Sequence, residues 1–267
     1  MFAKLLKHEF RTSKSILGLL SLVALGVAVL ATIALKLVVC SAGNQLMLIA
    51  TPMLDFSVIA LVIYAVAGEL LLLAQFYKSK FTDEGYLTFT LPASPHVIYL
   101  SSLLNILIWS ILVVLTLVVS FGIVLLFGTS PDQLINTRRF ANVEWQRSFA
   151  EVSAVLGLDA LDTLISLIRA LISMVFSVVL STTSITIGAT AAKKHKILAA
   201  VGIYYGISMV ITMVQNMLLV PMTYRNATNL EAIWDFTGTV QTVIWLACIV
   251  VGYFLTTHMM KKKLNLP

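Results

Sequence analysis

Six apolar stretches, each long enough to cross a lipid bilayer, dominate this chain of 267 residues. A helix needs about 20 consecutive apolar residues to span a hydrocarbon core of about 30 Å. Hydrophobic residues make up 59% of the chain and charged residues 11%, whereas a soluble domain has roughly 45–50% and about 25%. Spans satisfy their backbone hydrogen bonds internally. The sequence therefore predicts an all-α integral membrane protein with one transmembrane domain over residues 1–267.

The predicted spans follow the apolar stretches and are separated by short polar connections. They cover about Ile16 to Val39, Met53 to Tyr77, Pro95 to Phe127, Leu164 to Ala192, Ile197 to Val220 and Thr239 to Met260. Ser94 suits the N-cap of the third span, with Pro95 at the first helical position. Pro221 is expected to close the fifth span. The longest polar connection, residues 129–163, is predicted to be an outer loop that ends in an amphipathic helix.

Residues 1–14 are expected to form an amphipathic elbow helix ahead of the first span. Its apolar residues at helical spacing are Phe2, Leu5, Leu6 and Phe10, and its basic residues face away from them. Such a helix lies in the plane of the membrane interface. A cleavable signal peptide is not expected, because the following apolar stretch is too long and no small-residue cleavage site ends it.

The basic residues predict the orientation of the six spans. Lysine and arginine near span ends favour the cytoplasmic side. Twelve of the 18 fall on one side: Lys4, Lys7, Arg11, Lys14, Lys78, Lys80, Lys193, Lys194, Lys196, Lys261, Lys262 and Lys263. The opposite loops carry Arg138, Arg139, Arg147 and Arg225, and Lys36 and Arg169 sit at span edges. Both termini are therefore expected to be cytoplasmic, and the net charge of +6 requires no nucleic acid partner.

The segment 78–100 is the one substantial polar segment on the predicted cytoplasmic side between spans. It reads KSKFTDEGYLTFTLPASPHVIYL, with acids at Asp83 and Glu84 and exposed aromatic candidates at Tyr86 and Phe89. Its acids suit a helix start, so a short helix or turn-helix is favoured over an isolated strand. Two interpretations remain open from the residues alone: a coupling element gripped by a soluble partner, or an ordinary interfacial loop. Gly85 suits close approach of a partner or a positive φ angle.

Three stretches of the chain resemble small type-2 ABC transporter permeases of Gram-positive bacteria. The strongest is Phe81-x-x-Glu84-Gly85-Tyr86-Leu87-Thr88-x-Thr90-Leu91-Pro92, which is similar to that family's segment between spans two and three. Two further stretches are similar to the same family. One is near the start of the chain and resembles its elbow helix, Leu6-Lys7-His8-Glu9-Phe10. The other lies between spans four and five, Lys193-Lys194-His195-Lys196-Ile197. The resemblance implies a six-span permease in the bacterial plasma membrane that dimerises, more readily as a homodimer, and exports peptide toxins or peptide antibiotics.

The same resemblance implies two separate ATPase subunits that dock on the segment 78–100. Partner contacts are expected at Asp83, Glu84, Gly85, Tyr86 and Phe89, because large aromatic residues anchor interfaces and acidic residues set their orientation. The chain has no G-x-x-x-x-G-K-[ST] phosphate loop. ATP and magnesium would therefore be bound by the partner, and no cofactor, metal ligand or catalytic residue is assigned to this chain.

Polar residues within the predicted spans are candidates for a substrate pathway. Glu69 lies about 13 Å above Lys78 along the second span, and an acid at that depth usually faces a cavity or a partner. Thr183 belongs to a hydroxyl cluster of the fourth span, and Gln215 and Asn216 share a face of the fifth. Such groups either hold helices together or line a pathway, and both interpretations are kept.

Two other classes of function compete with an ABC permease. An ATP-independent secondary transporter or channel would favour inverted repeats with broken helices, and the two halves of the sequence show no convincing match. A membrane anchor or sensor subunit would favour a larger extramembrane domain, which the chain does not carry.

Overall fold

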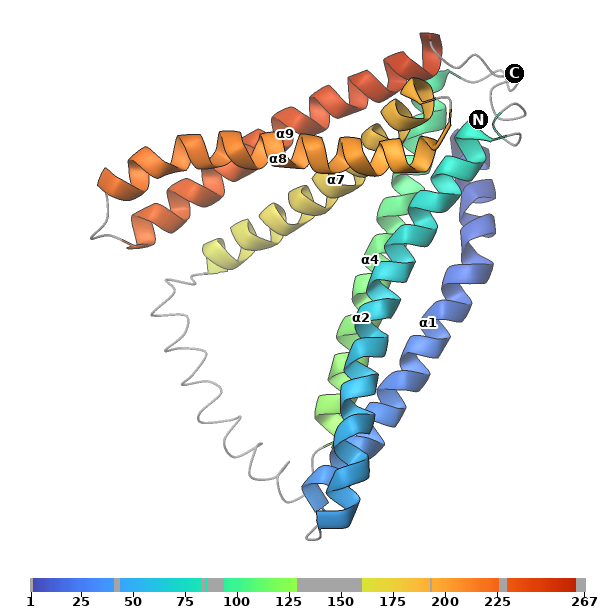
Figure 1. The fold of residues 1–267 in the computed structure, drawn as a ribbon, viewed down its shortest axis with the longest axis vertical. Coiled ribbons are helices and arrows are strands. Elements are labelled where there is room, and N and C mark those ends of the chain that lie inside the picture. Colours follow the sequence, from blue (N-terminus) through green and yellow to red (C-terminus); the bar gives the residue numbers. More distant parts are fainter. Residues whose placement is uncertain are drawn as a thin grey trace. The chain divides into compact units, whose positions relative to one another are not determined.

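The computed structural model of the protein describes residues 2–40, 44–82, 85, 94–128, 160–192, 194–225 and 230–262. Regular structure in these residues is entirely helical. The helices are α1 (Phe2–Cys40), α2 (Asn44–Phe81), α4 (Pro95–Gly128), α7 (Ala160–Ala191), α8 (Lys196–Arg225) and α9 (Leu230–Lys262) (Figure 1). Each contains a stretch long and apolar enough to cross a membrane. The prediction of an all-α, multi-pass membrane protein with six such helices is confirmed.

The helices are longer than the predicted spans, and two predicted breaks are absent. α1 is continuous from Phe2 to Cys40, so residues 2–14 and the first predicted span belong to one long helix, and the place of residues 2–14 in the membrane interface stays a prediction. Pro221 does not end α8, which continues to Arg225. A proline removes one backbone donor and disturbs the preceding turn, and one further turn of helix remains here.

The helices belong to two compact units, which are described one at a time. The first, called here the α1–α2–α4 unit, consists of Lys7–Leu72 and Ile108–Gly157. The second, called the α7–α8–α9 unit, consists of Met1–Leu6, Leu73–Leu107 and Leu158–Pro267. The second unit therefore includes the end of α2 and the beginning of α4.

Small side chains allow close packing of helices in the α1–α2–α4 unit. Ala24 and Ala28 are buried one turn apart on α1. Ala24 packs with Tyr64 of α2 and Val113 of α4, and the Tyr64 hydroxyl lies 3.0 Å from Oγ of Ser21. Lipid is as apolar as the helix surfaces, so small residues and interhelical hydrogen bonds are what favour association in a membrane.

In the α7–α8–α9 unit, α7 and α8 form a hairpin whose backbones meet near the turn. A Cβ on Gly188 would lie 2.5 Å from the backbone nitrogen of Ala200, so the close approach requires glycine. The chain reverses at His195, which has a φ of 56°. Histidine is among the residues that adopt this left-handed conformation more readily than most. The prediction of a short connection between the fourth and fifth spans is thus confirmed by the end of α7 at Ala191 and the start of α8 at Lys196, and its place on the inner side stays a prediction.

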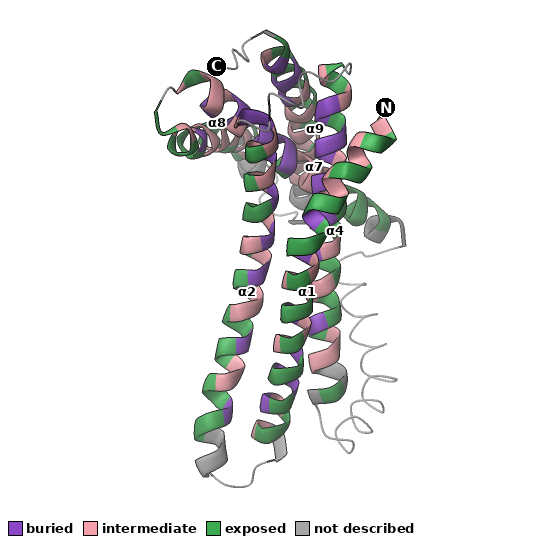
Figure 2. Ribbon diagram, turned by 90° about the vertical axis from the view of Figure 1, so that its right-hand side faces the viewer, coloured by how far each residue is buried: buried purple, intermediate pink, exposed green. Residues whose placement is uncertain are grey.

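Large apolar side chains cover much of the exposed surface of both units. Figure 2 shows buried positions as narrow stripes on helices that are otherwise intermediate or exposed. Phe56 of α2 is 74% exposed and Leu198 of α8 is 75% exposed. In a soluble protein such a surface would be unfavourable, whereas in a bilayer it faces lipid or another membrane helix.

Candidate functional site

An aromatic cluster holds both ends of the connection between α2 and α4. Phe76 and Phe81 lie on the last turns of α2, with ring centroids 6.0 Å apart. Phe76 contacts Tyr99 of α4 at 6.4 Å. Tyr99 in turn lies 5.5 Å from Tyr253 of α9, whose hydroxyl is 3.4 Å from Nδ1 of His96. We call these five residues the anchor cluster, since they join the ends of α2 and α4 to α9.

Buried hydroxyl groups extend the anchor cluster to α7. The Tyr99 hydroxyl lies 2.9 Å from Oγ1 of Thr182. Thr183 Oγ1 lies 3.0 Å from Oγ1 of Thr256 and 3.3 Å from the carbonyl oxygen of Gly252. The side chains of Tyr99, Thr182 and Thr256 have no exposed surface. These contacts tie the first turns of α4 to α7, and α7 to α9.

Local sequence explains why these hydroxyls can be buried between helices. Thr182 and Thr183 also donate to carbonyls one turn back, at Val178 and Val179, which satisfies a hydroxyl without water. A Cβ on Gly252 would lie 2.8 Å from the side chain of Val179. Glycine at that position therefore lets α9 approach α7 closely enough for the hydroxyl pair to form.

Three residues of the cluster, Phe81, His96 and Tyr99, belong to the predicted docking segment 78–100, and only part of that segment is described. Asp83, Glu84, Tyr86 and Phe89 lie outside the described residues. α4 begins at Pro95, as predicted, and the Ser94 carbonyl accepts hydrogen bonds from the amides of residues 97 and 98.

Gly85 is described, and its environment explains why glycine occurs there. Its amide donates to the carbonyl of Thr82 at 2.8 Å. A Cβ on Gly85 would lie 2.5 Å from the carbonyl oxygen of Lys80, and its φ is not in the left-handed region. Of the two reasons given for this glycine, a positive φ is therefore wrong. The close approach is made by the chain's own backbone, and contact with a partner stays a prediction.

Two acidic residues lie within the membrane-spanning part of α2, in the α1–α2–α4 unit. Glu69 was predicted as a pathway residue, and it is partly exposed. Asp55, fully in the exposed class, was not identified from the sequence. They are 14 positions apart in the sequence, which is nearly four helical turns or about 21 Å, so both lie on the same side of α2. Neither makes a hydrogen bond or an ion pair with any described residue.

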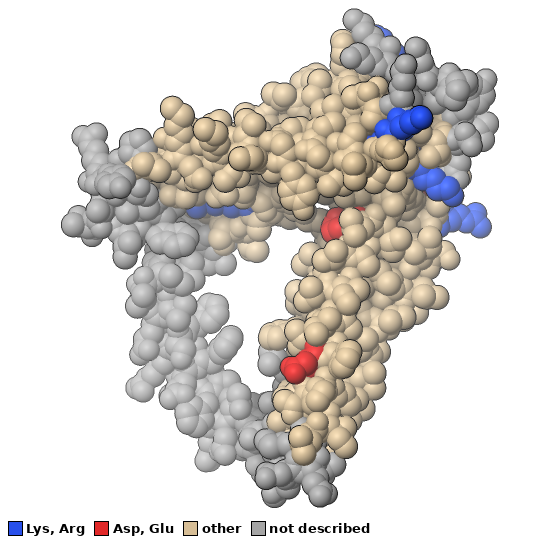
Figure 3. Space-filling view, in the orientation of Figure 1, with Lys and Arg blue, Asp and Glu red and all other residues tan. Residues whose placement is uncertain are grey.

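The acids of α2 interrupt an otherwise uncharged surface. Figure 3 shows acidic atoms at isolated places among the uncharged atoms of the helices. Around them α2 exposes Phe56, Val62 and Val66 by more than half. A carboxylate in such surroundings is unfavourable unless water, a proton or a cationic group reaches it.

The remaining predicted pathway residues are not brought together. Thr183 is 4% exposed and uses its hydroxyl between α7 and α9. Gln215 and Asn216 lie on α8, where Asn216 is exposed and Nε2 of Gln215 is buried without a hydrogen-bond partner in the described part of the chain. Their role in a substrate pathway stays a prediction.

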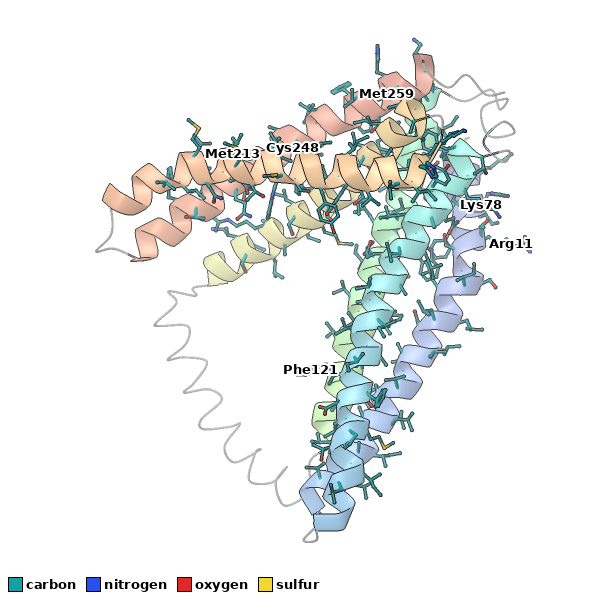
Figure 4. The ribbon with its side chains drawn as sticks, viewed as in Figure 1. Arg11, Lys78, Phe121, Met213, Cys248 and Met259 are labelled. Atoms are coloured by element: carbon teal, nitrogen blue, oxygen red, sulfur yellow. The ribbon has the colours of Figure 1, made fainter. Side chains whose placement is uncertain are left out.

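No metal centre is found among the residues that the structure describes. They contain no group of three or more histidine, cysteine, aspartate or glutamate side chains that could hold a metal ion. Cys248 is a free, partly buried thiol on α9 (Figure 4). Arg169, the one basic residue of α7, donates to Oγ1 of Thr239 at 3.3 Å.

The tyrosines of the anchor cluster were not identified as functional candidates from the sequence. Tyr99 lies one turn inside α4, and Tyr253 lies about two turns from the end of α9. Tyrosines near span ends are common because the ring is apolar and the hydroxyl is polar. A position near a span end indicates that each tyrosine lies at the membrane interface. It does not indicate that Tyr99 and Tyr253, which are distant in sequence, are in contact.

Comparison with known proteins assigns the chain to no family. It matches no protein-family model, no curated protein and no solved structure. The anchor cluster and the two acids of α2 are therefore the features on which a function can be argued.

Proposed function

We propose that this protein is the membrane-spanning permease subunit of a type-2 ABC exporter. It moves an amphipathic or peptide-like substrate outward, using ATP hydrolysed by a separate ATPase subunit. The observation that supports this most is the anchor cluster. A force applied to the connection between α2 and α4 reaches α9 through Tyr253 and α7 through the Tyr99–Thr182 contact.

In this proposal the ATPase docks on the segment 78–100 from the cytoplasm. Asp83, Glu84, Tyr86 and Phe89 make the contact, and the packed ends of α2 and α4 transmit its movement. The protein lies in the bacterial plasma membrane with both termini cytoplasmic. Two copies, or this chain and a sibling, assemble with two ATPases.

Asp55 and Glu69 form part of the substrate pathway in this proposal. Both are unpaired within the described residues and lie on one side of α2. Acids within spans usually face a cavity or a partner. Basic groups of an amphipathic peptide would be attracted to them.

The docking is tested by purification of the full chain with an ABC ATPase encoded beside its gene. The wild-type chain is expected to retain the ATPase in detergent. The double variant Glu84→Ala/Tyr86→Ala is expected to weaken binding about 30-fold or more, because an aromatic hot spot contributes at least about 2 kcal/mol.

A matched control is the double variant Ser79→Ala/Thr82→Ala, which changes polar residues at the edge of the same segment without removing an acid or a ring. It should bind and export as wild type does. The docking proposal is wrong if the wild-type chain binds no ATPase. It is also wrong if Glu84→Ala/Tyr86→Ala binds and exports normally.

An ATP-independent secondary transporter is the second candidate, and the acids of α2 favour it. Intramembrane carboxylates are typical of proton- and ion-coupled transporters. The two candidates differ in energy source. Transport in vesicles that stops when a proton ionophore is added, and that needs no ATPase subunit, would favour the secondary transporter.

A further inference from the structure

α8 is the least covered of the membrane-spanning helices. Of its apolar stretch, 6% is buried, against 17–28% for the other five. Figure 2 shows it largely as exposed and intermediate positions. One side of α8 is held by the hairpin with α7 near Gly188 and Ala200. Within the α7–α8–α9 unit, α8 also contacts α9, and the residue types at its exposed positions are not evenly distributed.

A seven-residue repeat runs along one face of α8. The six positions are Leu198, Gly202, Tyr205, Met209, Thr212 and Asn216, at successive spacings of four, three, four, three and four. All six are exposed. This is the spacing of a seam between two helices that wind around each other. We call these positions the α8 seam, which is about 27 Å long and close to the thickness of the hydrocarbon core.

The α8 seam differs in composition from the other exposed positions of the helix. Three of its six residues are small or polar, namely Gly202, Thr212 and Asn216. The exposed positions of the helix away from the seam are apolar, and Gly206 is the one small residue among them: Ile197, Val201, Gly206, Val210, Met213, Val214, Met217, Leu218 and Val220. Lipid-facing surfaces suit aliphatic residues, whereas contacts between membrane helices are enriched in small residues and hydrogen-bonding side chains. The composition therefore indicates a protein partner for the seam.

The seam is complementary to itself. The Asn216 carboxamide has both donors and an acceptor, and it makes no hydrogen bond with any described residue. Across a two-fold axis the Asn216 carboxamide of one copy could form a hydrogen bond with the Asn216 carboxamide of the other copy. A polar residue at one seam position fixes the register of such a pair. Around Gly202 no atom lies within 4 Å of where a Cβ would stand, so a second backbone can approach there.

The exposed area is sufficient for a specific contact. Leu198, Tyr205 and Met209 are 75%, 68% and 75% exposed. Counted on two helices, these side chains supply on the order of 1,000 Å², about the lower limit for a specific interface. Figure 4 labels the neighbouring Met213, which is 71% exposed and flanks the seam on the same helix.

We propose that the α8 seam packs against the α8 seam of a second copy of this chain, in parallel and around a two-fold axis along the membrane normal. The proposal deepens the proposed function, which needs two permease protomers, but it is carried by the exposure and composition of α8 alone. The seam positions then lie at the centre of the contact, and the aliphatic positions face lipid.

Disulfide cross-linking of the full-length protein in native membranes tests this arrangement. Cys40 and Cys248 are first replaced by alanine, and single cysteines are introduced as Leu198→Cys or Met209→Cys. The adjacent exposed positions, as Ile197→Cys and Val210→Cys, are the matched controls at the same depth. Mild oxidation is expected to give roughly tenfold more covalent dimer at the seam positions, because a disulfide forms only when the Cα atoms are within about 7 Å.

The role of the amide is tested in the Met209→Cys background. Asn216→Leu is expected to lower dimer formation between about 3-fold and 30-fold, the range that corresponds to hydrogen bonds between membrane helices. Asn216→Gln should retain most of the dimer. If Asn216→Leu and Asn216→Gln lower dimer formation equally, a hydrogen bond between the two amides does not hold the dimer together.

Absence of covalent dimer at both Leu198→Cys and Met209→Cys would overturn the proposal, as would equal cross-linking at Ile197→Cys and Val210→Cys. The first result would mean that lipid or another segment covers the seam. ATPase co-purification measured on the same samples separates the two proposals. Retained ATPase without cross-linking refutes the seam alone, and cross-linking without ATPase refutes the exporter alone.

Discussion

A carboxylate inside a membrane-spanning helix is unfavourable unless something compensates its charge. Asp55 and Glu69 have no partner among the described residues, and they share one side of α2. Glu69 was identified from the sequence because it lies far inside an apolar run. Asp55 was missed because it lies two residues after the predicted start of its span at Met53, whereas the apolar part of α2 begins at Leu48. A boundary error of a few residues thus concealed an intramembrane acid.

Neutralising these acids is expected to impair transport without affecting assembly. Glu69→Gln and Asp55→Asn keep the shape of each side chain and remove its charge. Each should reduce substrate-stimulated ATP hydrolysis and export roughly tenfold, the factor that corresponds to about 1.4 kcal/mol of lost interaction. Glu69→Asp, which keeps the charge, is the control and should retain most activity. Normal export by both neutral variants, or loss of the protein from the membrane, would exclude the pathway role.

At the scale of helices, composition predicts which segments are spans but not how they meet. Hydropathy is summed over about 20 residues, so a single polar residue changes the sum little. For that reason all six apolar helices are predicted. Helix ends depend on single residues, and for that reason the continuity of α1 and the passage of α8 through Pro221 were not predicted. The contact between His96 and Tyr253 joins residues 157 positions apart, and no local pattern encodes it.

The α7–α8 hairpin depends on one glycine. A Cβ on Gly188 would stand 2.5 Å and 2.6 Å from backbone atoms of Ala200, which cannot move unless the helices separate. Gly188→Ala is therefore expected to destabilise the protein by about 1–3 kcal/mol, as overpacking does. The measurement is the midpoint of thermal unfolding in detergent.

Gly122→Ala is the matched control for this change. Gly122 also lies inside a helix, α4, and no atom lies within 4 Å of its Cβ position. Alanine there should be neutral or stabilise the protein by up to about 1 kcal/mol, since it favours helix more than glycine does. If both variants unfold at the same temperature, the close approach of α7 and α8 does not contribute to stability.

At the scale of the whole molecule, charge is the property that orients the helices. Twelve lysines and arginines fall near one set of span ends, and four fall in the opposite loops. The anchor cluster lies near the end of α2 that carries Lys78 and Lys80 and the end of α9 that carries Lys261. The proposed docking segment and the cluster that would transmit its movement are thus expected on the cytoplasmic side, where ATP is available.

The predicted orientation can be measured with an impermeant thiol reagent on intact cells. In a chain without Cys40 and Cys248, single cysteines at Gly43, Asn142 and Asn229 are expected to react from outside. Cysteines at Ser79 and Asn265 should react only after the membrane is opened, because the positive-inside rule places their neighbouring lysines in the cytoplasm. Ser79 is the decisive position, since it lies on α2 beside the docking segment. Labelling of Ser79→Cys in intact cells would invert the orientation and would place the docking segment out of reach of any cytoplasmic ATPase.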